Sequence, residues 1–223
     1  MTYEGMRLKF RNNIYIPLTC KQRGKKLRNS HFTIISNNCW SGTVYEAYNL
    51  QKQTPTVGLF FMASDYIRFL SDLQHYLSVE LEFIKPEHSK WKNQLKSNSN
   101  WGTYPIALLD DIEVQLLHYY GSEEDIRSKW KRRIDRIDWD HLLVKFNDQN
   151  SCTQEDIEAF FNLPFKNKLF FTCKDNTKNR DKYGRNYIVI KQRVRNETVM
   201  ASYEPYCDSK YLILTELINS LGE

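Results

Sequence analysis

Glycine is scarce in this chain, with eight glycines among 223 residues. Neither of the two common glycine-rich phosphate-binding loops occurs, because no G-x-G-x-x-G and no G-x-x-x-x-G-K-[ST] can be found. We therefore expect neither a standard Rossmann NAD enzyme nor a P-loop NTPase.

Long apolar runs are also missing. The longest, at residues 55–63, is far short of the roughly 20 residues that a membrane-spanning helix needs. The first eleven residues lack the apolar segment of a secretory signal. These absences predict a cytoplasmic protein without a membrane span.

Cysteine is too sparse and too scattered for a disulfide framework. An odd number of cysteines leaves at least one thiol unpaired, and no two of them form C-x-x-C. None of the five histidines stands at metal-finger spacing from a cysteine or another histidine. We expect reduced thiols and no metal site; the cysteines are Cys20, Cys39, Cys152, Cys173 and Cys207.

Positive charge is concentrated at one end. Residues 1–28 carry eight basic side chains and one acid, a net charge of +7, whereas the remaining 195 residues have 24 basic and 26 acidic side chains. We therefore divide the chain into a basic arm (1–28) and a single α/β domain (29–223). The arm is either a solvated leader or a peripheral contact with the inner face of an anionic membrane. Nucleic acid is not expected as a partner, because the body has no basic surplus.

Strand-like and helix-like segments alternate beyond the arm. This alternation predicts a mostly parallel sheet with helices on both faces. The expected strands are 31–36, 56–62, 79–84, 104–109, 141–146, 168–173 and 187–190; the expected helices are 42–51, 64–77, 121–137, 153–161 and 211–221. Ser64 with Asp65, Ser122 and Thr153 are the expected caps of the helices 64–77, 121–137 and 153–161. Polar loops are expected at 85–102, which we expect to be flexible, and at 175–185.

Open α/β sheets bind ligands beyond the carboxyl ends of their strands. Polar and reactive side chains follow several of the predicted strands, which places a site at this edge of the sheet. They are Ser36, Asn37, Asn38 and Cys39 after the first strand, Ser64 and Asp65 after the second, Asp110 and Asp111 after residues 104–109, His118 further on, Asn147 and Asp148 after residues 141–146, and Cys173 and Lys174 at the end of residues 168–173.

Cys39 is the sharpest candidate for chemistry. A thiol in a strand-to-helix turn lies near unpaired backbone N–H groups, which lower its pKa and raise its nucleophilicity. The amides of Asn37 and Asn38 would donate to an oxyanion, and His118 would serve as the general base. Asp110 or Asp111 would orient the histidine, whereas Ser36, Trp40 and Asp65 would contact substrate. The alternative is that Cys39 is a packing residue.

Asp110 and Asp111 also support a second interpretation. Paired carboxylates at a strand end suit Mg²⁺ or Mn²⁺ and a sugar nucleotide, as in a metal-dependent glycosyltransferase. Phosphate groups of such a donor, or of coenzyme A, would contact the basic stripe that Lys129, Arg132 and Arg133 form on the predicted helix 121–137. The alternatives are helix capping and a solvated basic face.

Several blocks of the sequence together resemble an uncharacterised bacterial family. The blocks are FTIISNNCWSG (32–42), TPTVGLF (54–60), YPI (104–106) with LDDI (109–112), HY (118–119), KW (129–130) and RR (132–133). The family is catalogued as a domain of unknown function, and its members are often labelled exopolysaccharide or capsular polysaccharide biosynthesis proteins. Ser41 and Thr54 depart from the family pattern.

The resemblance implies an α/β fold and a place in surface-glycan assembly, without implying a reaction. Combined with the Cys39 motif, it leads us to expect a glycan-modifying acyltransferase that uses an acyl-coenzyme A donor. Its partner would be a polysaccharide or a lipid-linked glycan precursor. The alternatives are the glycosyltransferase and a non-enzymatic glycan-binding protein with exposed aromatic residues such as Trp91 and Trp101.

Overall fold

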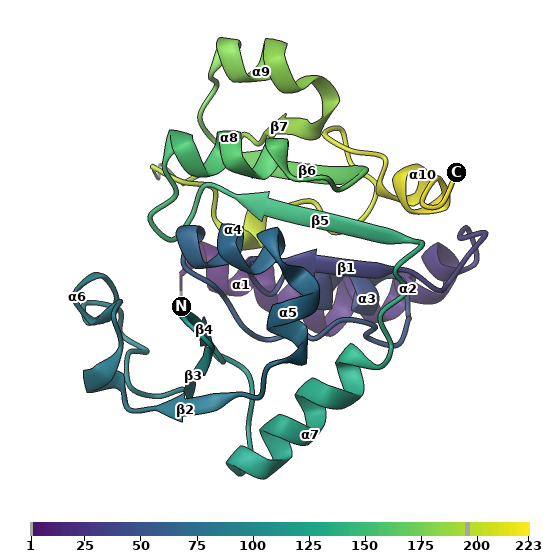
Figure 1. The fold of residues 1–223 in the computed structure, drawn as a ribbon. Coiled ribbons are helices and arrows are strands. Elements are labelled where there is room, and N and C mark those ends of the chain that lie inside the picture. The colour runs from purple at the N-terminus through teal and green to yellow at the C-terminus, as the bar shows by residue number, and fades with distance from the viewer. Residues whose placement is uncertain (1, 195–196) are drawn as a thin grey trace.

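A four-stranded parallel sheet forms the centre of the protein (Figure 1). The computed structural model describes residues 2–194 and 197–223. In spatial order the strands are β1 (Thr33–Ser36), β5 (Leu142–Asn147), β6 (Asn167–Thr172) and β7 (Tyr187–Val189). Each neighbouring pair runs parallel, so the four carboxyl ends meet at one edge. The predicted parallel α/β architecture is confirmed.

Two of the segments predicted as strands belong to a separate antiparallel sheet. This sheet consists of β2 (Glu82–Ile84), β3 (Ile106–Leu109) and β4 (Ile112–Gln115). Only Asp110 and Asp111 connect β3 to β4. A parallel crossover needs a dozen residues or more, so the pair can only form a hairpin.

Several predictions of local structure are wrong. Residues 56–62 form no regular strand, and a single bridge pairs Phe60 with Gln115. At the start of this segment the side-chain hydroxyl of Thr56 accepts a hydrogen bond from the Ser36 amide of β1 at 3.1 Å, a side-chain contact in place of strand pairing. The predicted loop 175–185 contains α9 (Thr177–Tyr183), whose first turn is capped by the Asn176 side chain.

Helices cover both faces of the parallel sheet, as predicted. Figure 1 shows α4 (Ala63–Ser71) and α5 (Leu73–Ser78) in front of the sheet and α3 (Trp40–Ala47) behind it. Side chains of adjacent strand residues alternate between the two hydrophobic cores; Val144 belongs to the front core and Leu143 to the rear core. The front core also includes α7 (Glu123–Ile134) and α8 (Gln154–Asn162), and the rear core includes α10 (Leu214–Asn219).

Helix starts follow the sequence signals in two cases out of three. Ser122 and Thr153 form capping boxes at α7 and α8. The expected cap at Ser64 and Asp65 is wrong, because α4 begins at Ala63 and both residues lie in its first turn.

The basic arm is helical from residue 3 to residue 24. It consists of α1 (Tyr3–Phe10), the π-helical segment η1 (Arg11–Tyr15) and α2 (Ile16–Gly24), with helical backbone angles at each junction. Ile16 and Cys20 lie in the rear core beside α3, so the arm packs on the body. Short elements complete the fold: η2 (Pro86–His88), α6 (Lys92–Leu95), η3 (Gly184–Asn186) and η4 (Ala201–Tyr203). Among the described helices, none is long and apolar enough to cross a bilayer.

Candidate functional site

A buried ion pair lies at the carboxyl edge of the parallel sheet. Lys145 is on the central strand β5, and Glu204 comes from the C-terminal segment just after η4. Lys145 Nζ donates to Glu204 Oε1 at 2.6 Å, and both side chains are completely buried. The pair connects β5 to the C-terminal segment, which lies far from it in the sequence. It does so at the edge of the sheet where α/β proteins bind ligands.

Three asparagines complete a hydrogen-bonded network around this pair. Lys145 Nζ also donates to Asn38 Oδ1 at 3.1 Å and to Asn37 Oδ1 at 3.3 Å. Asn147 donates from Nδ2 to Glu204 Oε1 at 2.6 Å. Its Oδ1 accepts a hydrogen bond from Asn37 Nδ2 at 2.7 Å. Buried charges need such partners, because an unpaired charge in the interior is strongly destabilising. We call these five residues the Lys145 network.

The amides predicted as oxyanion donors are therefore already engaged. Asn37 Nδ2 donates to Asn147, and Asn38 Nδ2 donates to the Glu204 carboxylate at 3.2 Å. Ser36 shapes the same turn, since its hydroxyl donates to the Asn38 carbonyl oxygen at 2.7 Å. Each carboxamide nitrogen carries two N–H groups, and in both residues the network engages at least one of them.

Burial sets the electrostatics of the network. Loss of solvation lowers the pKa of Lys145, and the neighbouring Glu204 carboxylate opposes this shift. The ammonium also lies 5.9 Å from the ring centroid of Trp40, a favourable cation–π distance. Trp40 in turn donates from Nε1 to the Pro205 carbonyl oxygen at 2.8 Å, so this predicted substrate contact holds the C-terminal segment in place.

An open cavity of about 390 Å³ adjoins the network. Five carboxamide residues line it, together with two aromatic side chains and the Cys39 thiol, and we call it the amide-lined cavity. The carboxamides are Asn38, Asn98, Asn100, Gln149 and Asn150, and the aromatic residues are Phe60 and Tyr104. Sequence reasoning had placed residues 85–102 in a flexible loop, and this segment supplies two of the lining amides.

Cys39 provides the one thiol among the residues lining this cavity. Its sulfur donates to the Leu59 carbonyl oxygen at 3.6 Å. Burial raises the pKa of Cys39 to about 11, and the Glu204 carboxylate adds to the rise. The expected lowering of the thiol pKa by the start of α3 is therefore wrong, because loss of solvation outweighs the nearby backbone donors.

His118 lies next to Gly58, which also contacts Cys39. The backbone N–H of His118 donates to the Gly58 carbonyl oxygen at 2.7 Å, and Gly58 forms a backbone hydrogen bond with Cys39. Gly58 has a φ of +79°, and a Cβ there would stand 3.2 Å from the Cβ of His118, so a side chain at this position would be strained. The exposed imidazole hydrogen-bonds to Tyr120 at 3.3 Å. Within the described residues, no hydrogen bond joins His118 to Cys39.

Asp110 and Asp111 occupy the hairpin turn at the far end of β4 from His118. Asp110 has a φ of 57°, a conformation that Asp tolerates better than most residues and that suits a two-residue hairpin. Its carboxylate hydrogen-bonds to His75 at 3.1 Å, whereas the carboxylate of Asp111 pairs with Arg68. In this arrangement neither carboxylate orients His118.

Asp65 belongs to a different buried polar cluster. Its carboxylate accepts hydrogen bonds from Lys90 Nζ at 2.7 Å, Trp91 Nε1 at 2.6 Å and the Glu113 amide at 3.1 Å. Glu113 in turn accepts from Ser89 at 2.6 Å. These contacts hold residues 89–91 against α4 and β4. The predicted substrate residue Asp65 therefore lies outside the amide-lined cavity, as does Trp91.

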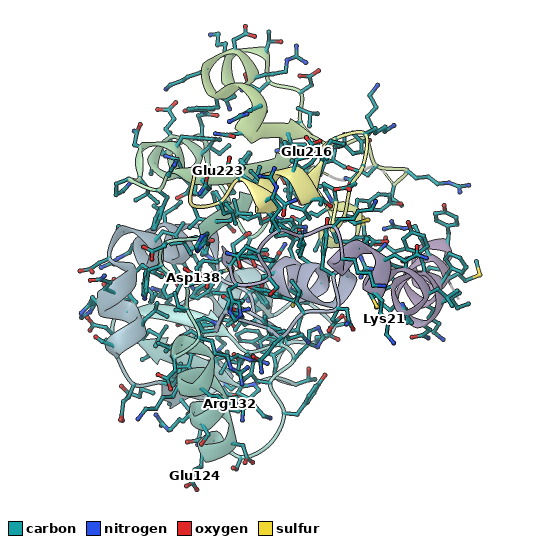
Figure 2. The ribbon with its side chains drawn as sticks, turned by 90° about the vertical axis from the view of Figure 1, so that its right-hand side faces the viewer. Lys21, Glu124, Arg132, Asp138, Glu216 and Glu223 are labelled. Carbon is teal, nitrogen blue, oxygen red and sulfur yellow. The ribbon has the colours of Figure 1, made fainter. Side chains whose placement is uncertain are left out.

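The basic stripe on α7 supports neighbouring loops. Lys129 donates to the Tyr120 carbonyl oxygen at 2.6 Å. Arg133 donates to the Val57 carbonyl oxygen at 3.1 Å and to the Tyr119 hydroxyl at 2.7 Å. Arg132 lies on the exposed surface of the helix (Figure 2). None of the three lines the amide-lined cavity.

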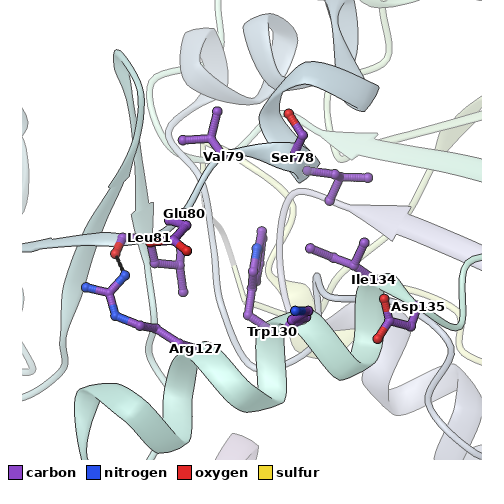
Figure 3. A pocket seen from close by; sticks show the side chains of 10 residues that line it. Ser78, Val79, Glu80, Leu81, Arg127, Trp130, Ile134 and Asp135 are labelled. Carbon is purple, nitrogen blue, oxygen red and sulfur yellow. Dashed lines mark hydrogen bonds between the residues drawn. The ribbon is translucent and has the colours of Figure 1, made fainter.

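A second cavity, of about 320 Å³, lies between α7 and the segment that follows α5 (Figure 3). Leu81, Trp130 and Ile134 provide apolar walls, and the Arg127 guanidinium at its edge donates to the Leu81 carbonyl oxygen. No residue from the turns that follow the strands of the parallel sheet lines this second cavity, whereas Asn38 and Cys39 follow β1, and Gln149 and Asn150 follow β5, in the amide-lined cavity. The amide-lined cavity is therefore the better candidate for the functional site.

Comparison with known proteins places this architecture in a family. Residues 10–219 match the family described as a domain of unknown function, DUF1919. The chain belongs to this family. It is also similar to a protein of Haemophilus influenzae that is described as uncharacterized, with 33% identity over 150 residues. The aligned part covers 67% of this chain and 66% of that relative.

Sequence reasoning missed Lys145 and Glu204, which both lie within the DUF1919 match. Lys145 carried a usable signal, because it interrupts the apolar run of a predicted buried strand. A lysine at such a position needs a buried partner. Glu204 carried none, since its segment shows no periodicity that would place it against β5.

Proposed function

We propose that this protein transfers an acyl group to a carbohydrate of bacterial surface-polysaccharide assembly, and that the reaction takes place in the amide-lined cavity. The observation that carries the proposal is the composition of this cavity. It combines carboxamides, two aromatic rings and a single thiol at the carboxyl edge of the sheet.

A sugar matches the lining of the cavity. Carboxamide groups both donate and accept hydrogen bonds, as sugar hydroxyls do. The rings of Phe60 and Tyr104 pack against each other at 5.9 Å and offer apolar surface to the C–H face of a sugar ring. A volume of about 390 Å³ suits a small ligand. The link to polysaccharide assembly itself depends on the resemblance of the sequence blocks.

Cys39 would carry the acyl group between donor and acceptor. Its sulfur attacks the carbonyl carbon of an acyl-coenzyme A thioester, the bond to the coenzyme sulfur breaks, and the Cys39 proton passes through a base to the leaving thiolate. A sugar hydroxyl then attacks the acyl-Cys39 thioester. The hydroxyl proton returns to the Cys39 sulfur, and the acylated sugar leaves.

The high pKa of Cys39 makes a base necessary for the first step. At a pKa of about 11, only about one thiol in ten thousand is ionised at pH 7. His118 is the base we propose, because it adjoins Gly58 beside Cys39 and its imidazole is exposed. For this role its ring must turn from Tyr120 toward Cys39 when substrate binds.

The test is the intact mass of the protein after incubation with acyl-coenzyme A. We expect one added acyl group on the wild type, none on Cys39→Ala, and strongly slowed acylation of His118→Ala. Cys152→Ala is the matched control, because burial raises the pKa of Cys152 as well. A Cys39→Ala protein that still acylates its sugar acceptor would overturn the proposed chemistry.

A second candidate, binding of a glycan without catalysis, is favoured by the high pKa of Cys39 and by the engagement of His118 with Tyr120. It predicts that oligosaccharides raise the melting temperature of wild type and Cys39→Ala equally, and that no acyl donor does so. Asn100→Ala, which removes a lining amide, should weaken sugar binding in either case.

A further inference from the structure

The helical arm presents an apolar stripe to solvent. Met6, Phe10, Ile14 and Leu18 are 52%, 56%, 47% and 75% exposed, respectively. Soluble proteins rarely leave several large apolar side chains exposed along a single helix face. The opposite face of the same helix is the one that packs on the body, through Ile16 and Cys20.

The π-helical segment keeps this stripe on one side. In a straight α-helix, residues four apart rotate by about 40° at each step, so a stripe spaced at four would spiral around the helix. In η1 the Ile16 amide bonds to the Arg11 carbonyl oxygen, five residues back, and the wider turn cancels much of that rotation. π-Helical turns inside α-helices are frequent at functional sites.

Basic residues of the arm divide into two sets. Arg7 and Arg23 contact the body: Arg7 donates to the Ser202 carbonyl oxygen at 2.7 Å, and Arg23 donates to the Ala47 carbonyl oxygen at 2.7 Å. Arg28, at the end of the arm, is exposed and pairs with Glu223. The lysines remain exposed, and they are Lys9, Lys21, Lys25 and Lys26. Figure 2 shows the arm at one edge of the molecule with Lys21 on it. Exposed positive charge therefore accompanies the apolar stripe.

We propose that this face of the arm docks on an anionic lipid bilayer. Apolar side chains would enter the boundary between headgroups and acyl chains, and the lysines would contact the headgroups. A second copy of the chain fits less well, because pairing two such faces would bring lysines of like charge together. The inference places the proposed enzyme beside a lipid-linked precursor, although the docking itself does not depend on the chemistry at Cys39.

Sedimentation with vesicles tests the proposal on the full chain. We expect binding to phosphatidylcholine vesicles that contain one-third phosphatidylglycerol, and little binding to pure phosphatidylcholine. Phe10→Ser/Leu18→Ser should lower the partition coefficient at least about tenfold. Lys9→Gln/Lys21→Gln/Lys25→Gln should lower it by about a hundredfold at low salt. Trp139→Ser is the matched control, since Trp139 is 46% exposed outside the arm, and it should bind as the wild type does.

Two outcomes would overturn the docking proposal. One is a wild-type protein that ignores anionic vesicles; the other is a dimer in solution that Phe10→Ser/Leu18→Ser dissociates. Unchanged melting temperatures would show that the variants fold. Acylation of Cys39, measured without vesicles on the same variants, separates the two proposals, because a docking-deficient protein should still be acylated.

Discussion

Removing one partner of the buried ion pair should reveal how strongly the Lys145 network holds the site together. Lys145→Met keeps a side chain of similar length but removes the ammonium. Glu204 would then be left completely buried, with hydrogen bonds from Asn38 and Asn147 and no positive partner.

The expected cost follows from these contacts. Breaking a buried pair by removing one partner typically costs 3–5 kcal/mol. Lys145 also donates to Asn37 and Asn38, and in the variant Asn37 loses this donor whereas Asn38 keeps only the Trp40 amide. We expect about 4 kcal/mol less stability. For a chain of this length, that is a fall in melting temperature of about 8–16 °C.

Urea unfolding at pH 7, followed by tryptophan fluorescence, provides the measurement. The double variant Lys145→Met/Glu204→Gln is the informative companion, because it removes both charges and retains hydrogen-bonding groups. It should recover about 2–3 kcal/mol relative to Lys145→Met alone. Two results would refute the reasoning. One is a loss of stability in the double variant equal to the sum of the losses in Lys145→Met and Glu204→Gln; the other is a Lys145→Met protein as stable as the wild type.

Three further predictions concern the neighbouring groups. Cys39 should react with iodoacetamide about a hundredfold more slowly at pH 7 than a thiol at the ordinary pKa of 9.0, and its rate should rise until about pH 11, which mass spectrometry can follow. Burial raises the pKa of Asp148 above its ordinary value of 3.8. The stability that the protonated carboxyl group contributes is therefore present below about pH 3.8 and is lost as the pH rises through the pKa of the folded protein. In urea unfolding, the stability of the wild type relative to Asp148→Asn should fall above about pH 4. Asp110→Asn/Asp111→Asn should change stability by less than about 1 kcal/mol for each ion pair, since the His75–Asp110 and Arg68–Asp111 pairs are exposed. The double variant should also retain the proposed acyl transfer. A wild-type activity that requires Mn²⁺ and that this variant loses would instead favour glycosyl transfer.

Local patterns predicted much of the secondary structure because they depend on neighbours in the chain. Ser122 and Thr153 marked helix starts through capping chemistry, which acts over three residues. Residues 56–62 have the composition of a strand, yet they form only one bridge, to Gln115. Composition cannot report which partner an extended segment will find.

Prediction of the site was less complete, for the same physical reason. The turn that carries Asn37, Asn38 and Cys39 was correctly placed at a strand end of the parallel sheet. The raised pKa of Cys39 was not predictable, because it depends on burial by segments distant in the sequence. Asp110 was predicted to orient a histidine or to bind a metal, because its carboxyl group follows a strand. Instead, its positive φ shows that it occupies a tight hairpin turn.

The sequence by itself determined the α/β class, the order of most elements, the basic arm and the motif turn at residues 36–39. Each of these follows from periodicity, charge or capping within short stretches of chain. Only the tertiary structure decided that Glu204 meets Lys145, that Asp110 lies away from His118, and that Arg7 and Arg23 of the arm contact the body. These outcomes depend on which buried groups must find partners once the chain is compact, and the partners are up to about two hundred residues apart.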